Sequence, residues 1–293
     1  MGNYLITGVS SGIGFETARQ LIEQGHRVFG SVRKEADATR LKEALGSQLV
    51  PLHFDVTDAQ AIEAAAKQVA HIVGQDGLSG LVNNAGIAIA GPLAWIDTEA
   101  LAYQLDVNLL GVHRVTKAFL PLLGAHSPPR QSPPGKIIFI SSVSGIFASP
   151  FLGPYCISKH ALEAMADSWR RELVIYDIPV VCIEPGSVKT PIWEKARQSV
   201  PACEGTDWEA FMRSAARQIA KSESIGLPVA QVAQLIVKVL HQRRPKPRYL
   251  IASNATTFWL LSRLPARWVD AFLWHFWMKK KWRKVQQVVA TNK

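Results

Sequence analysis

The chain has 293 residues, of which 48% are hydrophobic and 19% are charged, and its net charge is +10. This length suits one large domain, or at most two, and the composition excludes a small disulfide-stapled scaffold, a disordered chain and a fibrous repeat. The charge is unevenly distributed: residues 238–293 carry thirteen Lys and Arg against one acid, and the other 237 residues have a net charge of −2. The basic character therefore belongs to the C-terminal segment, which argues against a nucleic-acid-binding core.

The cysteines and the hydropathy pattern bear on the compartment. Cys156, Cys182 and Cys203 are widely spaced and form no C-x-x-C pair, so neither a disulfide framework nor a zinc site is predicted. No signal-peptide pattern precedes the apolar run at 3–7, and no stretch reaches the roughly 18 uncharged apolar residues of a membrane span. We therefore expect a cytoplasmic protein without a bound metal.

The first 250 residues alternate short apolar runs with helical patterns, which is typical of βαβ units around a parallel sheet. The predicted strands are 3–7, 27–32, 49–54, 79–83, 136–141, 179–184 and 248–252. The predicted helices are 13–24, 37–46, 58–73, 98–123 with a break, 154–177 and 228–241. The segment 124–135 contains two Pro-Pro pairs and is expected to form a surface loop, at the sheet edge opposite the one where such folds bind ligands.

A glycine-rich segment lies between the first predicted strand and the first predicted helix. Residues 7–14 read Thr-Gly-Val-Ser-Ser-Gly-Ile-Gly. Glycines allow a tight turn and close approach of the backbone to a pyrophosphate, and the N-terminus of the helix attracts its charge. An ordinary βα turn is the alternative, but three glycines at this spacing in the first βαβ unit favour a dinucleotide site.

The spacing T-G-x-x-x-G-x-G resembles that of the classical branch of the short-chain dehydrogenase/reductase family. Taken as a whole, the chain looks most like the hydroxysteroid and retinol dehydrogenase-like members of that branch. Further motifs of that branch follow in the expected order: Asp55-Val56, Asn83-Asn84-Ala85-Gly86, Asn108, Ser142, Tyr155-x-x-x-Lys159 and Pro185-Gly186. The resemblance implies an α/β fold with a single Rossmann-like, doubly wound parallel sheet of order 3-2-1-4-5-6-7. It also implies NAD(P)-dependent interconversion of an alcohol and a carbonyl compound.

The candidate catalytic residues are Asn108, Ser142, Tyr155 and Lys159. Tyr155 and Lys159 are four apart on one predicted helix face, so the ammonium can lie near the phenol and lower its pKa from about 10. By resemblance, Tyr155 is the general acid/base, and Lys159 also holds the nicotinamide ribose. Ser142 orients the substrate oxygen, with Ser141 as the adjacent alternative, and Asn108 holds a water that links the lysine to solvent.

The end of the second predicted strand bears on cofactor choice. NAD-specific folds place an acid there, whereas this chain has Val32 followed by Arg33 and Lys34. The charges favour NADP, with Arg33 stacking on the adenine and pairing with the 2′-phosphate, and NAD use stays open. By resemblance, Asp55 binds the adenine amino group and Asn84 lies near the adenosine ribose. The full predicted cofactor-binding set is Gly8, Ser10, Ser11, Gly12, Ile13, Gly14, Arg33, Asp55, Val56, Asn84, Ala85, Gly86, Asn108, Tyr155, Lys159, Pro185, Gly186, Val188 and Thr190.

The segment 143–154 is uncharged, and by resemblance it walls the substrate cavity. Its Phe147, Phe151 and Leu152 favour a lipophilic alcohol or carbonyl substrate that is steroid-, retinoid- or lipid-like, although these side chains can equally be core. The segment 187–226 is expected to form a substrate lid. Ile192 and Trp193 of this segment are expected near the mouth of the substrate cavity.

Residues 1–254 are interpreted as the catalytic domain and 255–293 as a helical extension. In the extension, Leu264, Trp268, Phe272 and Phe276 are four apart, and a Lys-Lys-Lys-Trp-Arg-Lys run follows. Such a helix can lie on an anionic membrane surface, which would make the protein peripheral to a membrane. Packing of the same rings on the domain, or on a partner subunit, is the other interpretation, and both stay open.

Two further questions concern partners and activity. The resemblance implies a homodimer or tetramer through the predicted helices 98–123 and 154–177, although the aromatic extension could block one such interface. A non-catalytic protein that senses a dinucleotide, or one that binds membranes on the same fold, is the alternative to an enzyme. The intact catalytic set argues against it.

Overall fold

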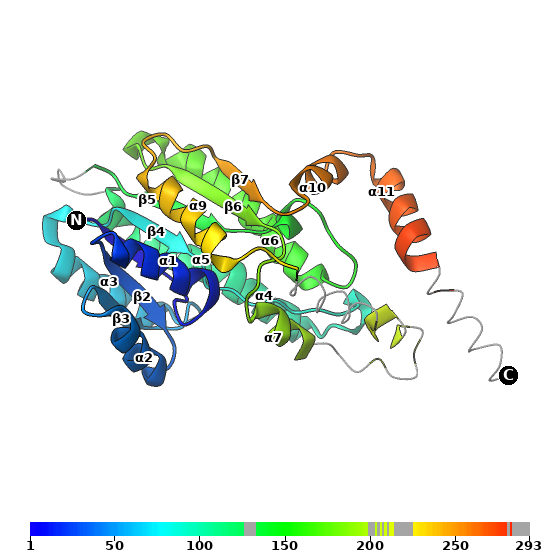
Figure 1. The fold of residues 1–293 in the computed structure, drawn as a ribbon, viewed down its shortest axis with the longest axis horizontal. Coiled ribbons are helices and arrows are strands. Elements are labelled where there is room, and N and C mark those ends of the chain that lie inside the picture. The colour runs from blue at the N-terminus through cyan, green and yellow to red at the C-terminus, as the bar shows by residue number, and fades with distance from the viewer. Residues whose placement is uncertain are drawn as a thin grey trace.

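The computed structural model describes residues 1–125, 133–198, 203, 206, 208–209, 211–213, 225–279 and 282. Within these residues a seven-stranded parallel sheet lies between two layers of helices (Figure 1). The strands are β1 (Asn3–Ile6), β2 (Arg27–Val32), β3 (Leu49–His53), β4 (Gly80–Asn83), β5 (Lys136–Ile140), β6 (Val180–Pro185) and β7 (Arg248–Ile251). Their order is β3-β2-β1-β4-β5-β6-β7 and neighbouring strands run parallel, which confirms the predicted fold class.

The sheet is buried on both faces because successive side chains of each strand enter opposite cores. On β5, Ile137 and Phe139 join one core, and Ile138 and Ile140 join the other. The helices over the Phe139 face include α3 (Ala59–Val73), α5 (Gly111–Phe119) and α6 (Gly153–Glu172). The helices over the Ile138 face include α1 (Gly12–Glu23), α2 (Glu35–Leu45) and α9 (Val229–His241).

The break predicted within 98–123 is a π-helical segment. The chain stays helical from α4 (Thr98–Leu105) through the π segment η3 (Asp106–Leu110) into α5. The remaining short turns are η1 (Gly74–Asp76), η2 (Leu93–Trp95), η4 (Leu120–Leu123), η5 (Val143–Gly145) and η6 (Leu173–Tyr176). π segments often occur at functional sites, and this one carries Asn108, a predicted catalytic residue.

The C-terminal extension forms α10 (Ala255–Leu261), α11 (Ala266–Leu273) and the π segment η7 (Trp274–Met278). The expectation that Leu264 shares one helical face with Trp268, Phe272 and Phe276 is wrong for Leu264. It precedes Pro265, the N-cap of α11, where the chain is extended. A proline at this position starts a new helix rather than continuing the previous one. Of the predicted basic run, only Lys279 and Trp282 fall within the described residues.

Two predicted loops are described only in part. Of the segment 124–135, residues 126–132 lie outside the described residues, and the described remainder leads directly into β5. Of the predicted lid, the structure describes its first part, including α7 (Ile192–Gln198), a few residues between 203 and 213, and its last two residues. The rest of that prediction lies outside the described residues.

Candidate active site

The glycine-rich turn joins β1 to α1 at the carboxyl edge of the sheet. Gly8 and Gly12 adopt φ of 70° and 60°, a conformation that other residues rarely adopt. A Cβ on Gly14 would lie 2.4 Å from the Gly8 carbonyl oxygen, so only glycine fits there. Ser11 is the N-cap of α1, its side chain makes no capping bond, and no acid occupies the first turn. The first-turn amides of α1 have no partner within the helix, so this N-terminus suits an anionic group such as a pyrophosphate.

Hydrogen bonds hold this turn onto the strands beside it. The Thr7 hydroxyl accepts from the amides of Asn84 and Ala85, both at 2.9 Å. The Asn84 side chain donates to the carbonyls of Thr7 and Gly8, at 2.9 and 3.0 Å, and the Gly8 amide donates to Ser31 Oγ at 2.9 Å. The Asn84 amide group therefore positions the turn. Sequence reasoning missed Thr7, although it opens the motif, and Ser31, for which the sequence carried no signal.

Arg33 follows β2 and Asp55 follows β3, and their side chains lie together in the same cavity. Arg33 Nη1 is 3.5 Å from Asp55 Oδ2, and the Arg33 side chain is 59% exposed. Burial raises the pKa of Asp55, but hydrogen bonds from Thr57 and the nearby Arg33 guanidinium lower it more, so the carboxyl pKa is below its ordinary value. An ionised acceptor and an exposed guanidinium at one rim suit an adenosine that carries a 2′-phosphate.

Tyr155 and Ser142 lie side by side at the other end of the cavity. Tyr155 near the start of α6 is 6% exposed, and Ser142 follows β5 and accepts from the Ser144 amide at 3.1 Å. Burial raises the pKa of Tyr155 to about 12, although its hydrogen bond with Ser142 acts in the opposite direction. The expected lowering of this pKa is therefore not found, because burial outweighs the neighbouring groups. The phenol is protonated near neutral pH and is suited to donate a proton.

Lys159 lies close to Tyr155 but does not bind the phenol oxygen. Its Nζ is 5.6 Å from the centre of the Tyr155 ring and donates to the Ile140 carbonyl at 2.7 Å. Its side chain is buried, and burial lowers the pKa of the ammonium to about 8. Lys159 is therefore a cation whose charge is sensitive to its immediate surroundings.

Asn108 sits behind the cavity wall in the π segment. Its side chain accepts from the Ile87 amide, donates to the Ile87 carbonyl, both at 2.9 Å, and donates to Ser158 Oγ at 3.1 Å. Gln104, one turn earlier, also binds the Ile87 carbonyl, at 2.9 Å. These amides fix the loop after β4. Sequence reasoning missed Gln104 and Ser158, because nothing in the sequence indicates which polar residues of a helix point inward.

One cavity brings most of the predicted site together. Of the predicted residues, Gly14 and Asn108 are not part of its described lining. The predicted residues that line it are Gly8, Ser10, Ser11, Gly12, Ile13, Arg33, Asp55, Val56, Asn84, Ala85, Gly86, Ser142, Tyr155, Lys159, Pro185, Gly186, Val188 and Thr190. The alternative Ser141 lines it as well, so spacing alone did not separate the two serines.

The cavity is apolar beside Tyr155. The Trp193 ring lies 6.0 Å from the Tyr155 ring, and Ile192 packs in the same cluster, as predicted for the mouth. Phe147, Phe151 and Leu152, for which a cavity wall and a core position were both left open, are not part of the described lining, and Leu152 packs in the cluster around Tyr155. Phe151 is buried against the rings of Trp208 and Phe211, which follow α7. The ring centre of Phe147 lies 6.1 Å from that of Phe258 in α10.

A doubly wound parallel sheet, a glycine-rich turn at its carboxyl edge and a tyrosine-lysine pair in the same cavity define an NAD(P)-dependent oxidoreductase. The family model for short chain dehydrogenases matches residues 3–201. The chain belongs to this family.

Individual relatives agree with this assignment. The chain is 41% identical over 254 residues to an NADPH-dependent 3-dehydrocapnine reductase of Ornithobacterium rhinotracheale, covering 87% of this chain and 89% of that protein. It is 36% identical over 282 residues to retinol dehydrogenase 5 of Homo sapiens, covering 92% and 86%. Among solved structures, a short-chain dehydrogenase from Streptomyces avermitilis matches with a TM-score of 0.76 at 25% identity, covering 98% and 97%. NADP is the cofactor that these findings support, and NAD is also compatible with the site.

Proposed function

We propose that the protein interconverts a lipophilic alcohol and its ketone or aldehyde with NADP(H), using Tyr155 as general acid/base. The observation that carries the proposal is that Tyr155, Ser142 and Lys159 line the same cavity as the glycine-rich turn. The apolar surroundings of Tyr155 support a lipophilic substrate. So do the relatives, which are named for 3-dehydrocapnine and for retinol.

The residues present fit a dinucleotide. The N-terminus of α1 and the glycine-rich turn would hold the pyrophosphate, Arg33 and Asp55 the adenosine end, and Lys159 the nicotinamide ribose. When bound, NADPH supplies a hydride to the carbonyl carbon of the substrate, or NADP accepts one from the alcohol.

The side chains supply the proton and the orientation. In reduction, the Ser142 hydroxyl donates a hydrogen bond to the substrate oxygen, and Tyr155 transfers its phenolic proton to that oxygen as negative charge develops on it. The raised pKa of Tyr155 keeps this proton in place until it is needed. The Lys159 ammonium, 5.6 Å from the ring, stabilises the phenolate that remains. In oxidation, the phenolate takes the proton from the alcohol.

Replacing Tyr155 with Phe tests this role. Because the ring is kept and the proton is lost, we expect turnover of NADPH to fall by at least about 100-fold while cofactor binding is retained. The measurements are NADPH oxidation with a lipophilic ketone and NADPH binding by fluorescence. Tyr103→Phe, a change at an exposed tyrosine of α4, is the matched control and should be neutral. Surviving turnover in Tyr155→Phe would contradict the acid/base assignment.

We infer further that the C-terminal extension binds an anionic membrane surface. Trp268, Phe272 and Phe276 are 68%, 47% and 80% exposed, and Arg263 lies over the Trp259 ring at 4.5 Å. Aromatic rings together with basic side chains are typical of helices that lie in a lipid interface. In the described part of the chain, no helix is long and apolar enough to cross a bilayer.

The extension also contacts the rest of the chain. Phe258 meets Phe147, and Met278 and Trp282 pack against the cluster around Phe151. These contacts leave the rings of Trp268, Phe272 and Phe276 available to lipid. The test compares binding to anionic vesicles by the full chain and by a chain ending at residue 254. We expect binding by the full chain alone, and equal binding would contradict the inference.

A further inference from the structure

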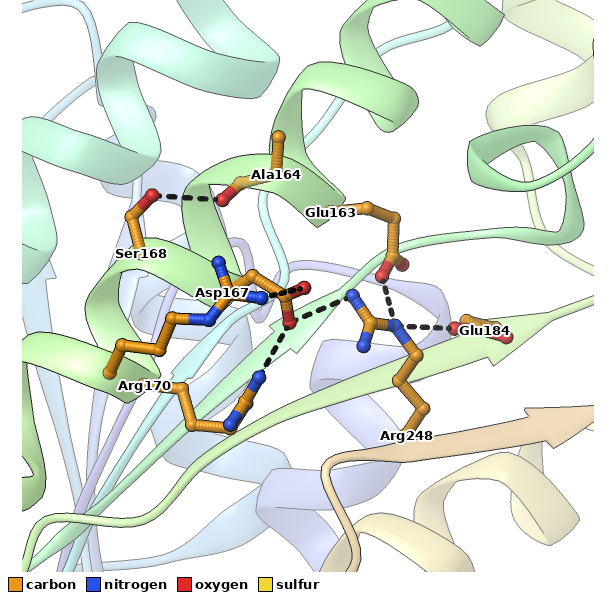
Figure 2. Close-up of polar contacts among 8 residues, drawn as sticks. Glu163, Ala164, Asp167, Ser168, Arg170, Glu184 and Arg248 are labelled. Carbon is orange, nitrogen blue, oxygen red and sulfur yellow. Dashed lines mark hydrogen bonds and ion pairs between the residues drawn. The ribbon is translucent and has the colours of Figure 1, made fainter.

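A group of charged side chains joins α6 to the last two strands of the sheet. Glu163 and Asp167 lie on α6, Glu184 on β6 and Arg248 on β7, and the guanidinium lies between the three carboxylates (Figure 2). Arg248 Nε is 2.9 Å from Glu163 Oε2 and 3.5 Å from Glu184 Oε1, and Arg248 Nη2 is 3.0 Å from Asp167 Oδ1. None of these residues was predicted to belong to the site.

Glu163 is also the closest member of this group to the catalytic machinery along α6. It is one turn beyond Lys159, so both side chains leave the same face of the helix. Their exposed fractions are 7% and 6%. A Cβ on Gly145, in the turn after Ser142, would lie 3.1 Å from both Glu163 Cγ and the Lys159 carbonyl oxygen. Glu163 therefore packs directly beneath the turn that carries Ser142.

We propose that Glu163 is a positioning residue for the reaction: its carboxylate, fixed by Arg248, keeps the buried Lys159 ammonium charged and so supports proton transfer at Tyr155. This inference rests on the roles proposed above for Tyr155 and Lys159. It assigns a function to a carboxylate that touches neither substrate nor cofactor.

Burial lowers the pKa of Lys159, and the carboxylate of Glu163 opposes that effect. In the described part of the chain, the titratable or charged groups around Lys159 and Glu163 lie on three elements. They are Tyr155 and Asp167 on α6, Cys182 and Glu184 on β6, and Arg248 on β7. The Cys182 thiol is neutral because burial raises its pKa, and burial also raises the pKa of Glu184 to about 7. Glu163 is thus the carboxylate placed to stabilise the ammonium.

The charge of Lys159 depends on pH. Lys159 is charged below its pKa, so any step that needs the ammonium is fully active at lower pH and is lost as the pH rises through that pKa. Removing the Glu163 charge lowers the pKa of Lys159 further. The loss of activity then moves to lower pH.

The substitution Glu163→Gln tests the proposal, because glutamine keeps the shape and can still accept from Arg248. We expect the alkaline loss of kcat/KM for NADPH-dependent reduction to move at least about half a pH unit lower than in the wild type. A profile that superimposes on that of the wild type would overturn the proposal. Glu163→Asp, which keeps the charge, should restore most of the wild-type profile.

Asp167→Asn is the matched control, because it removes a carboxylate from the same Arg248 but lies one further turn from Lys159. It should leave the profile unchanged, and an equal shift would overturn the specific role of Glu163. If Glu163→Gln does not fold, Glu163→Met removes the same charge at similar length, and Arg248 keeps Asp167 and Glu184 as partners. The same direction of shift is expected, and no shift would overturn the proposal.

A second measurement separates this proposal from the proposed function. Because Lys159 would hold the nicotinamide ribose, NADPH binding should weaken as the pH rises. The pH at which binding weakens should be lower in Glu163→Gln than in the wild type. Fluorescence titration with NADPH reads this without turnover. If the wild type turns over no substrate but the binding curve of Glu163→Gln is still displaced from that of the wild type, only the proposed function is contradicted. If the two binding curves coincide, the role of Glu163 is contradicted.

Discussion

The nucleotide-binding part and the C-terminal extension use aromatic residues in opposite ways. Phe29 and Phe119 are fully buried between the sheet and its helices, whereas Trp268 and Phe276 on the extension are more than two thirds exposed. The first part of the chain buries most of its large apolar side chains. The extension carries more apolar surface than its own contacts cover, and its net charge of +7 makes up most of the net charge of +10 of the chain. Stability should therefore depend on the first part, and attachment to a surface on the second.

The largest expected effect concerns the core. Phe29→Ala removes a fully buried ring from β2 and should lower the free energy of unfolding by about 3–5 kcal/mol. Trp268→Ala removes a larger but exposed ring from α11 and should change it by less than about 0.5 kcal/mol. Denaturant unfolding of both variants measures the difference. Comparable losses would show that the extension is part of the cooperative fold.

An intermediate effect is expected at the adenosine end of the cavity. Arg33→Ala should raise KM for NADPH by about tenfold or more and leave KM for NADH nearly unchanged, because a charge-assisted bond to the 2′-phosphate is lost. Steady-state kinetics with both cofactors measure this. Lys34→Ala, at the next residue, is the matched control, because Lys34 is exposed and does not line the described cavity. Equal changes for both cofactors would contradict 2′-phosphate recognition by Arg33.

The smallest effect on the folded domain is expected from the extension. Replacing Trp268, Phe272 and Phe276 together by Ser should abolish binding to anionic vesicles and leave turnover of a small water-soluble ketone unchanged. The control replaces Val174 and Ile175, which are 66% and 76% exposed elsewhere on the surface. Vesicle co-sedimentation and NADPH oxidation provide the two readouts. A similar loss of binding in both variants would indicate a general effect of apolar surface.

Much of the fold could be predicted because parallel strands buried on both faces are near-continuous apolar runs. The sequence Lys-Ile-Ile-Phe-Ile of β5 is one such run, and the glycine-rich turn marks where β1 ends. The predicted strand order is the observed one. Most predicted site residues also line one cavity, since motifs that follow parallel strands meet at the same sheet edge.

What could not be predicted depends on contacts between distant segments and on burial. The approach of Arg248 to Glu163 joins residues 85 positions apart, and no local pattern encodes it. The spacing of Tyr155 and Lys159 correctly indicated proximity, but the pKa of the phenol depends on how deeply it is buried. Phe151 was ambiguous for the same reason, because an uncharged loop residue fits a cavity wall and a core equally well.

The proposed function requires that this cavity catalyse NADPH-dependent carbonyl reduction of a lipophilic substrate. The most direct test follows oxidation of NADPH and NADH in parallel over a panel of steroid, retinoid and aliphatic ketones and aldehydes, with the wild type and Tyr155→Phe. We expect turnover of at least one lipophilic member by the wild type, with preference for NADPH, and none by the variant. Binding of NADPH without turnover of any member would contradict the claim and favour a non-catalytic, dinucleotide-sensing protein.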